Sequence, residues 1–137
     1  MKKKKKLAEE QNIPRTMRVR DSILKTYSYL KAIFKIQSKE TESLFFNQII
    51  QEGIQEVRKI NKQGKVILVS AYRGKRFVIG GNLSEETNAQ FNEVVKEFDW
   101  GVQESVEVLI YLSSLKRLSK YEQEFFGLPE MKIVVLV

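Results

Sequence analysis

The segment RTMRVRD, residues 15–21, decides the fold because apolar and polar side chains alternate along it. Met17 and Val19 fall on one side of an extended chain, and the residues between them fall on the other. The polar positions are Thr16, Arg18 and Arg20. This period of two predicts a short, half-buried strand with one apolar face and one cationic face.

Two amphipathic helices are predicted directly after this strand. In ILKTYSYLKAIFKIQ, residues 23–37, apolar side chains recur at spacings of four, three and four residues. The same spacing returns after a turn that contains Ser and Thr, and it predicts a second helix over residues 42–59. The apolar positions are Ile23, Tyr27, Leu30 and Phe34, then Phe46, Ile50, Gly53 and Val57.

The second half of the chain repeats the order of strand, helix, turn and helix. An apolar strand predicted over 65–72 and the following RFVIGG, residues 76–81, indicate a β-hairpin. Ser84 is a predicted N-cap, because two glutamates follow it and open an amphipathic segment. A further helix follows the sequence DWG, and MKIVVLV, residues 131–137, is a predicted strand that we expect to be paired in a sheet.

Residue offsets align the two halves. An offset of 64 pairs Tyr27 with Phe91, and an offset of 62 pairs Glu42 with Glu104. The second unit is therefore either a copy of the first or a small α+β assembly domain formed by the hairpin and the terminal strand. The predicted fold class is α+β, mainly α with short strands.

The net charge of +7 is divided unequally along the chain. Residues 1–76 hold 19 of the 24 Lys and Arg and 7 of the 17 Asp and Glu, for a charge of +12, whereas residues 77–137 carry −5. This asymmetry predicts a nucleic-acid-facing first part and a second part that assembles the protein or docks another one. We expect a disordered basic arm over 1–14, a DNA-binding unit over 15–60 and the second unit over 61–137.

The strand and helix pair of residues 15–60 resemble the ribbon-helix-helix family of DNA-binding proteins, the MetJ/Arc type. The resemblance implies that two such strands pair into an antiparallel ribbon that enters the major groove of duplex DNA. It also implies a homodimer or higher oligomer, or a pseudo-dimer within one chain if both units are copies. The base-reading residues that it implies are Thr16, Arg18 and Arg20.

The chemistry of these side chains suits DNA. An Arg guanidinium donates hydrogen bonds to guanine O6 and N7 at the same time. A Thr side chain donates or accepts a hydrogen bond, or contacts a thymine methyl group. Members of the family also hold a phosphate at the start of the second helix, where Glu40 and Glu42 depart from the pattern because they would compete with the anion. The residues expected to bind phosphate are Lys25, Ser38, Lys39, Thr41 and Ser43.

The composition excludes many enzymes. The chain has no Cys and no His, so catalytic triads, thiol nucleophiles and the usual zinc sites are ruled out, and no segment has the spacing of a phosphate-binding P-loop. We expect no enzymatic activity, no metal and no cofactor. No apolar run is long enough to span a bilayer and no secretory signal is seen, so we expect a cytoplasmic protein without a membrane partner.

The expected function is sequence-specific binding of double-stranded DNA, as a relaxosome-type accessory protein of a plasmid or mobile element, or as a transcriptional repressor. One alternative is an adaptor or antitoxin whose basic face binds an acidic protein. Another is an RNA-binding protein, which would prefer single strands or A-form duplexes.

Overall fold

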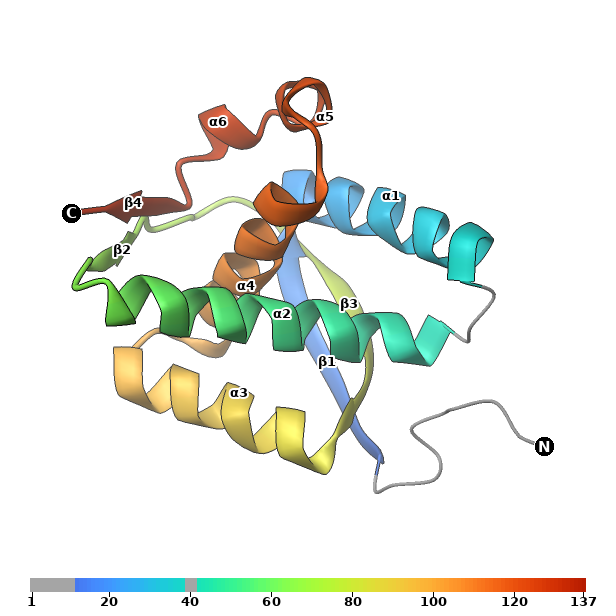
Figure 1. Cartoon of the computed structure of the whole chain (residues 1–137), viewed down its shortest axis with the longest axis horizontal. Helices are drawn as coiled ribbons and strands as arrows, with labels where there is room; N and C mark the ends of the chain where they lie inside the picture. Colours follow the sequence, from blue (N-terminus) through green and yellow to red (C-terminus); the bar gives the residue numbers. More distant parts are fainter. Residues whose placement is uncertain (1–11, 39–41) are drawn as a thin grey trace.

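The computed structural model of the chain describes residues 12–38 and 42–137, and its fold is of the α+β class (Figure 1). A strand followed by two helices occurs twice, and the described elements are β1 (Asn12–Arg20), α1 (Asp21–Ser38), α2 (Glu42–Lys62), β2 (Ile67–Val69), β3 (Arg76–Ser84), α3 (Glu85–Phe98), α4 (Val102–Arg117), α5 (Lys120–Phe125), α6 (Leu128–Met131) and β4 (Val134–Leu136). The class expected from the sequence is thus confirmed. Residues 12–14 belong to β1 and not to the expected disordered arm, whose residues 1–11 lie outside the described part.

Strands β1 and β3 form an antiparallel ribbon within one chain. All nine positions of β1 have partners, from Asn12 opposite Ser84 to Arg20 opposite Arg76. The central pair is Thr16 and Gly80, two residues that are 64 positions apart. This is the offset that aligns the first helices of the two units, so the ribbon has the register of two strands related by a twofold axis through its central pair.

The α2 and α4 helices cross at close range, and their contacts correct the predicted alignment of the second helices. A Cβ atom added to Gly53 would lie 2.5 Å from the carbonyl oxygen of Leu109, and the Ser113 hydroxyl donates to the carbonyl of Ile49 at 2.8 Å. An offset of 60 relates these two contacts, because it maps Gly53 onto Ser113 and Ile49 onto Leu109. An offset of 62 does not relate them. The offset of 62 is therefore wrong.

The physical reason for the different offset is the length of the first helices. The first helix of unit one, α1, has 18 residues, whereas α3 has 14 and is about one turn shorter. Because the chain drops one helical turn, α4 starts at Val102, 60 positions after α2 starts at Glu42. Removing about one turn from a helix leaves its apolar residues on the same face. The amphipathic pattern therefore did not reveal that α3 is shorter than α1.

One hydrophobic core joins the two units. The inner face of the ribbon contributes buried side chains from both strands, among them Val19 and Leu83, and these pack in the same cluster as Phe46, Phe91 and Leu109. In Figure 1, α2 runs across the ribbon with α1 and α3 on opposite sides of it. The segments 15–60 and 61–137 therefore pack as one body.

The predicted hairpin over 65–81 is wrong. In the described part of the chain, β2 pairs with β4, from Ile67 opposite Leu136 to Val69 opposite Val134, and β3 pairs with β1. Pairing with β1 gives β3 a nine-position ladder and a buried inner face, whereas β2 has only three residues to offer. The prediction that the terminal strand is paired in a sheet is confirmed.

The start of α3 follows the capping chemistry that the sequence predicts. The Ser84 hydroxyl accepts a hydrogen bond from the backbone N–H of Thr87 at 3.1 Å, and Glu85 and Glu86 occupy the first turn. Carboxylates near the free N–H groups of a helix start are stabilising. The end of β3 and the direction of α3 are thereby fixed at the same residue.

Candidate nucleic-acid interface

The outer face of the β1–β3 ribbon is open to solvent. Alternation along β1 leaves Thr16 and Arg18 exposed, while Met17 and Val19 are buried on the inner face. On β3 the corresponding outer positions are Val78, Gly80 and Asn82, of which the first two are exposed and the third is half-buried. The predicted strand with one apolar and one polar face is therefore present, with two of its three predicted base-reading residues on the exposed side.

Arg20 does not lie on this exposed face, and its prediction as an outward-facing reader is corrected. Its residue is only 7% exposed, and Glu107 of α4 accepts from its backbone N–H at 2.6 Å and from its Nη2 at 2.9 Å. The strand ends at Arg20, and the carboxylate of Glu107 is almost fully buried beneath it. A buried carboxylate needs a cation, so the guanidinium turns inward.

A second guanidinium joins this buried cluster. Arg76 lies opposite Arg20 across the ribbon, and its Nη2 is 3.5 Å from the Glu107 Oε1. Both guanidinium groups lie over the ring of Tyr72, at 4.2 Å for Arg20 and 5.2 Å for Arg76. Two cations thus share one carboxylate, and this end of the ribbon keeps a positive charge. Arg18, Arg73 and Lys75 are exposed at the same end.

The predicted phosphate contacts are only partly within the described residues. Lys25 is exposed on α1 and forms an ion pair with Asp21, at 3.1 Å between Nζ and Oδ2. Ser38 ends α1 and Ser43 follows the first residue of α2, whereas Lys39 and Thr41 lie outside the described residues. The phosphate clamp at the start of α2 stays a prediction.

Asn82 is a candidate functional residue that was not predicted from the sequence. The predicted strand ended at Gly81, but β3 continues to Ser84 and brings Asn82 to the outer side of the ribbon. The offset of 64 would have found this residue, because it maps Arg18 onto Asn82. Gly81, where the predicted strand ended, has a packing role. A Cβ atom at this position would lie 2.8 Å from the Cβ of Phe46.

Arg15 holds the ribbon against α3. Its Nη1 donates to the Asn88 Oδ1 at 2.6 Å and to the Asn92 Oδ1 at 3.3 Å, and its guanidinium lies 5.1 Å from the ring centroid of Phe91. These contacts occupy the side chain on the inner side of the ribbon. Arg18 is therefore the cation of β1 that faces solvent.

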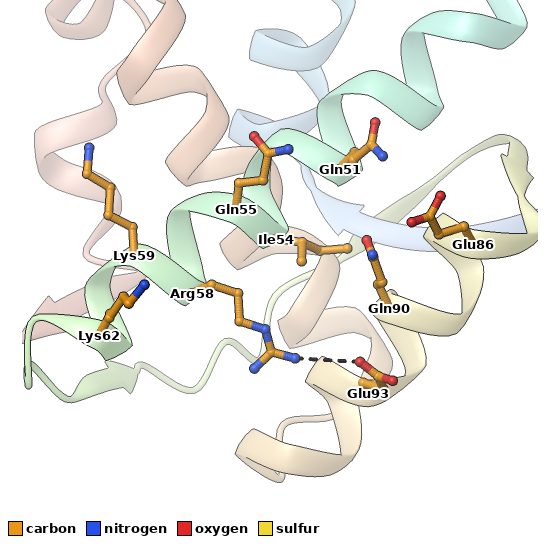
Figure 2. A pocket seen from close by; sticks show the side chains of 9 residues that line it. All are labelled: Gln51, Ile54, Gln55, Arg58, Lys59, Lys62, Glu86, Gln90 and Glu93. Atoms are coloured by element: carbon orange, nitrogen blue, oxygen red, sulfur yellow. Dashed lines mark ion pairs between the residues drawn. The ribbon is translucent and has the colours of Figure 1, made fainter.

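A groove of about 610 Å³ lies between α2 and α3 (Figure 2). Arg58 reaches across it to two carboxylates of α3, with its Nη1 2.5 Å from Glu97 Oε1 and its Nη2 3.8 Å from Glu93 Oε1. Lys59, also on the rim, extends away from α3 (Figure 2). Arg58 is thus paired with two carboxylates of α3, and we assign this pairing to the packing of α2 against α3.

An exposed aromatic surface lies on α1 and α5. Tyr121 is 75% and Phe125 72% exposed, and Tyr29 contacts the same surface. The Tyr29 hydroxyl donates to the Glu122 carboxylate, which also accepts from the backbone N–H of Ser119 at 2.9 Å. These hydrogen bonds favour the charged carboxylate and lower the pKa of Glu122, and the first one also raises the pKa of Tyr29.

Over residues 12–38 and 42–137, no group of three or more Asp and Glu residues is arranged to hold a metal ion. None of the helices in this described part has the length and apolar character that crossing a membrane requires. In comparisons with known proteins, no protein-family model, no curated protein and no solved structure matches this chain.

Proposed function

We propose that this protein binds double-stranded DNA by inserting the outer face of the β1–β3 ribbon into the major groove. The observation that carries the proposal is a complete two-stranded ribbon whose outer face is open and bears Thr16, Arg18 and Asn82. Paired strands lie about 4.8 Å apart, and the major groove is about 12 Å wide, so a single ribbon fits within it. The ribbon-helix-helix resemblance of the sequence is consistent with this arrangement.

The side chains on this face match base edges. Arg18 can bond guanine O6 and N7 with two parallel N–H groups, and Asn82 can bond adenine N6 and N7 in the same bidentate manner. The positive end of the ribbon, with exposed Arg73 and Lys75, adds attraction to the phosphates on either side of the groove. In this proposal Arg20 and Arg76 shape the ribbon and its field without contacting bases.

The ribbon is complete in one chain, because β3 of the second unit supplies the partner strand of β1. The family resemblance allowed this arrangement as well as pairing between two molecules. The homodimer therefore stays a separate prediction, and sedimentation of the protein alone and on DNA measures it. Roles as a repressor or as an accessory protein of a mobile element are proposals within the same DNA-binding function.

A binding experiment tests the proposal. Fluorescence anisotropy on a duplex selected from a random pool should give salt-dependent binding, and Arg18→Ala should weaken specific affinity by about ten-fold, since a bidentate Arg–guanine contact discriminates by about 1–3 kcal/mol. Lys62→Ala is the matched control, because it removes one exposed cation from the end of α2, away from the ribbon.

Two outcomes would contradict the proposal. Equal effects of Arg18→Ala and Lys62→Ala would mean that the ribbon face does not specify the site. A preference for single-stranded or A-form RNA over duplex DNA would favour the RNA-binding alternative, and failure to bind any nucleic acid would favour the adaptor that docks an acidic protein.

A further inference from the structure

The pseudo-twofold axis of the ribbon relates residues of different chemistry. The axis passes through the pair of Thr16 and Gly80, so the offset of 64 exchanges Arg18 with Asn82 and Pro14 with Val78. Arg18 lies opposite Val78, and Asn82 lies opposite Pro14, on the two sides of the axis. The two halves of the exposed face are thus geometrically equivalent but chemically unlike.

From this juxtaposition we propose that the DNA site is not a palindrome: one half carries a guanine read by Arg18, and the other half carries an adenine read by Asn82. The inference rests on the proposed DNA-binding function. A ribbon built from two identical strands would read the same base on both sides of its axis. Here a guanidinium donates two hydrogen bonds on one side, and a carboxamide donates one and accepts one on the other.

The buried contacts beneath the ribbon keep its two strands unlike. The last residue of each strand donates its backbone N–H to a side chain on the second helix of the other unit: Arg20 donates to Glu107 at 2.6 Å, and Ser84 donates to Asn47 Oδ1 at 2.9 Å. The two contacts occupy equivalent places in the two units, because the offset of 64 maps Arg20 onto Ser84 and the offset of 60 maps Asn47 onto Glu107. One is a buried ion pair and the other is neutral.

This difference opposes the pairing of like units from two chains. Two first units would bring Arg20 against Asn47 and leave a buried guanidinium without a carboxylate. Two second units would bring Ser84 against Glu107, and this buried carboxylate would lose Arg20 and keep only Arg76, whose Nη2 lies 3.5 Å away. The first arrangement carries the cost of an unpaired buried charge, and the second loses the closer of the two cations that pair with Glu107, so the structure favours unlike pairing and with it an asymmetric reading face.

Selection from a random duplex pool tests the inference. The wild-type protein should enrich a non-palindromic sequence with the guanine confined to one half. Asn82→Arg should enrich a sequence with guanine in both halves and should prefer it over the wild-type site by about ten-fold. Asn61→Arg, which adds the same charge at the exposed end of α2, should leave the selected sequence unchanged.

The outcomes separate the inference from the function on which it rests. Enrichment of a palindrome by the wild-type protein overturns the inference and leaves DNA binding intact, whereas no enrichment of any duplex overturns both. If Asn82→Arg does not fold by circular dichroism, Arg18→Asn decides: it should lose the guanine and gain adenine in that half. An unchanged selected sequence in Arg18→Asn overturns the inference.

Discussion

The buried ion pair between Arg20 and Glu107 provides the sharpest test of how the two units are held together. Glu107 is 1% exposed and is the carboxylate shared by Arg20 and Arg76, whose side chains are 9% and 15% exposed. Glu107→Ala leaves both guanidinium groups without their partner and removes the acceptor of the Arg20 backbone N–H. Breaking a buried pair from one side costs about 3–5 kcal/mol.

Equilibrium unfolding in urea measures this loss. With a slope of about 2 kcal/mol per molar urea, a loss of that size lowers the unfolding midpoint by about 2 M. The control is Glu97→Ala, which removes the 2.5 Å contact with Arg58 at a position where both side chains are more than one-third exposed. An exposed pair contributes about 0–1 kcal/mol, so the unfolding midpoint of this control should move by less than about 0.5 M.

A double variant separates the charge from general disruption. Glu107→Asn alone should be strongly destabilising, because Arg20 stays buried without a carboxylate. Combining it with Arg20→Ser copies the Ser84 and Asn47 contact of the other half. The double variant should recover the part of the lost stability that comes from Arg20, whereas Arg76 still lacks its carboxylate. If Glu107→Ala costs no more than Glu97→Ala, or if the double variant recovers nothing, the ion pair does not hold β1 to α4 as we infer.

Three further predictions concern packing, capping and titration. Gly81→Ala should destabilise the protein by about 1–3 kcal/mol in urea unfolding, because its Cβ atom would lie 2.8 Å from the Phe46 Cβ; unchanged stability would mean that the core yields there. Ser84→Ala should cost about 1 kcal/mol in the same assay by removing the N-cap of α3, and Ser84→Gly should cost less. Tyr29→Phe should raise the pKa of Glu122 towards its ordinary value in an NMR titration of the carboxyl carbon. Since the hydrogen bond lowers that pKa in the folded state, its stabilisation is present at neutral pH and is lost as the pH falls through the lowered pKa; an identical titration in Tyr29→Phe would contradict this.

Much of the local structure could be predicted from the sequence. The alternation around Arg18, the spacing of apolar residues in the helices and the Ser84 cap are local patterns, and local geometry decides them. The hairpin prediction failed because the choice of a strand's partner is not local. β2 and β3 are neighbours in sequence, but β3 pairs with β1 over nine positions and its apolar face packs in the core with the helices.

The candidate site divides in the same way. The sequence identified Thr16 and Arg18 correctly as outward-facing, because their exposure follows from the period of the strand. The prediction that Arg20 faces outward was wrong, because no pattern near the strand indicates that Glu107, 87 positions away, is buried beneath it. Asn82 was missed because the predicted strand ended at Gly81, whereas β3 continues to Ser84.

By itself, the sequence determined the strands and the four long helices, the repeat of strand and helix pair, and the cationic character of the first half, because periodicity and charge are properties of the residues in order. Only the tertiary structure decided that β1 and β3 pair within one chain and that Arg20 pairs with the buried carboxylate of Glu107. It also decided that Arg18 and Asn82 occupy equivalent places on one open face. These are contacts between distant segments, and their free energies depend on burial and mutual distance, which a linear pattern does not contain.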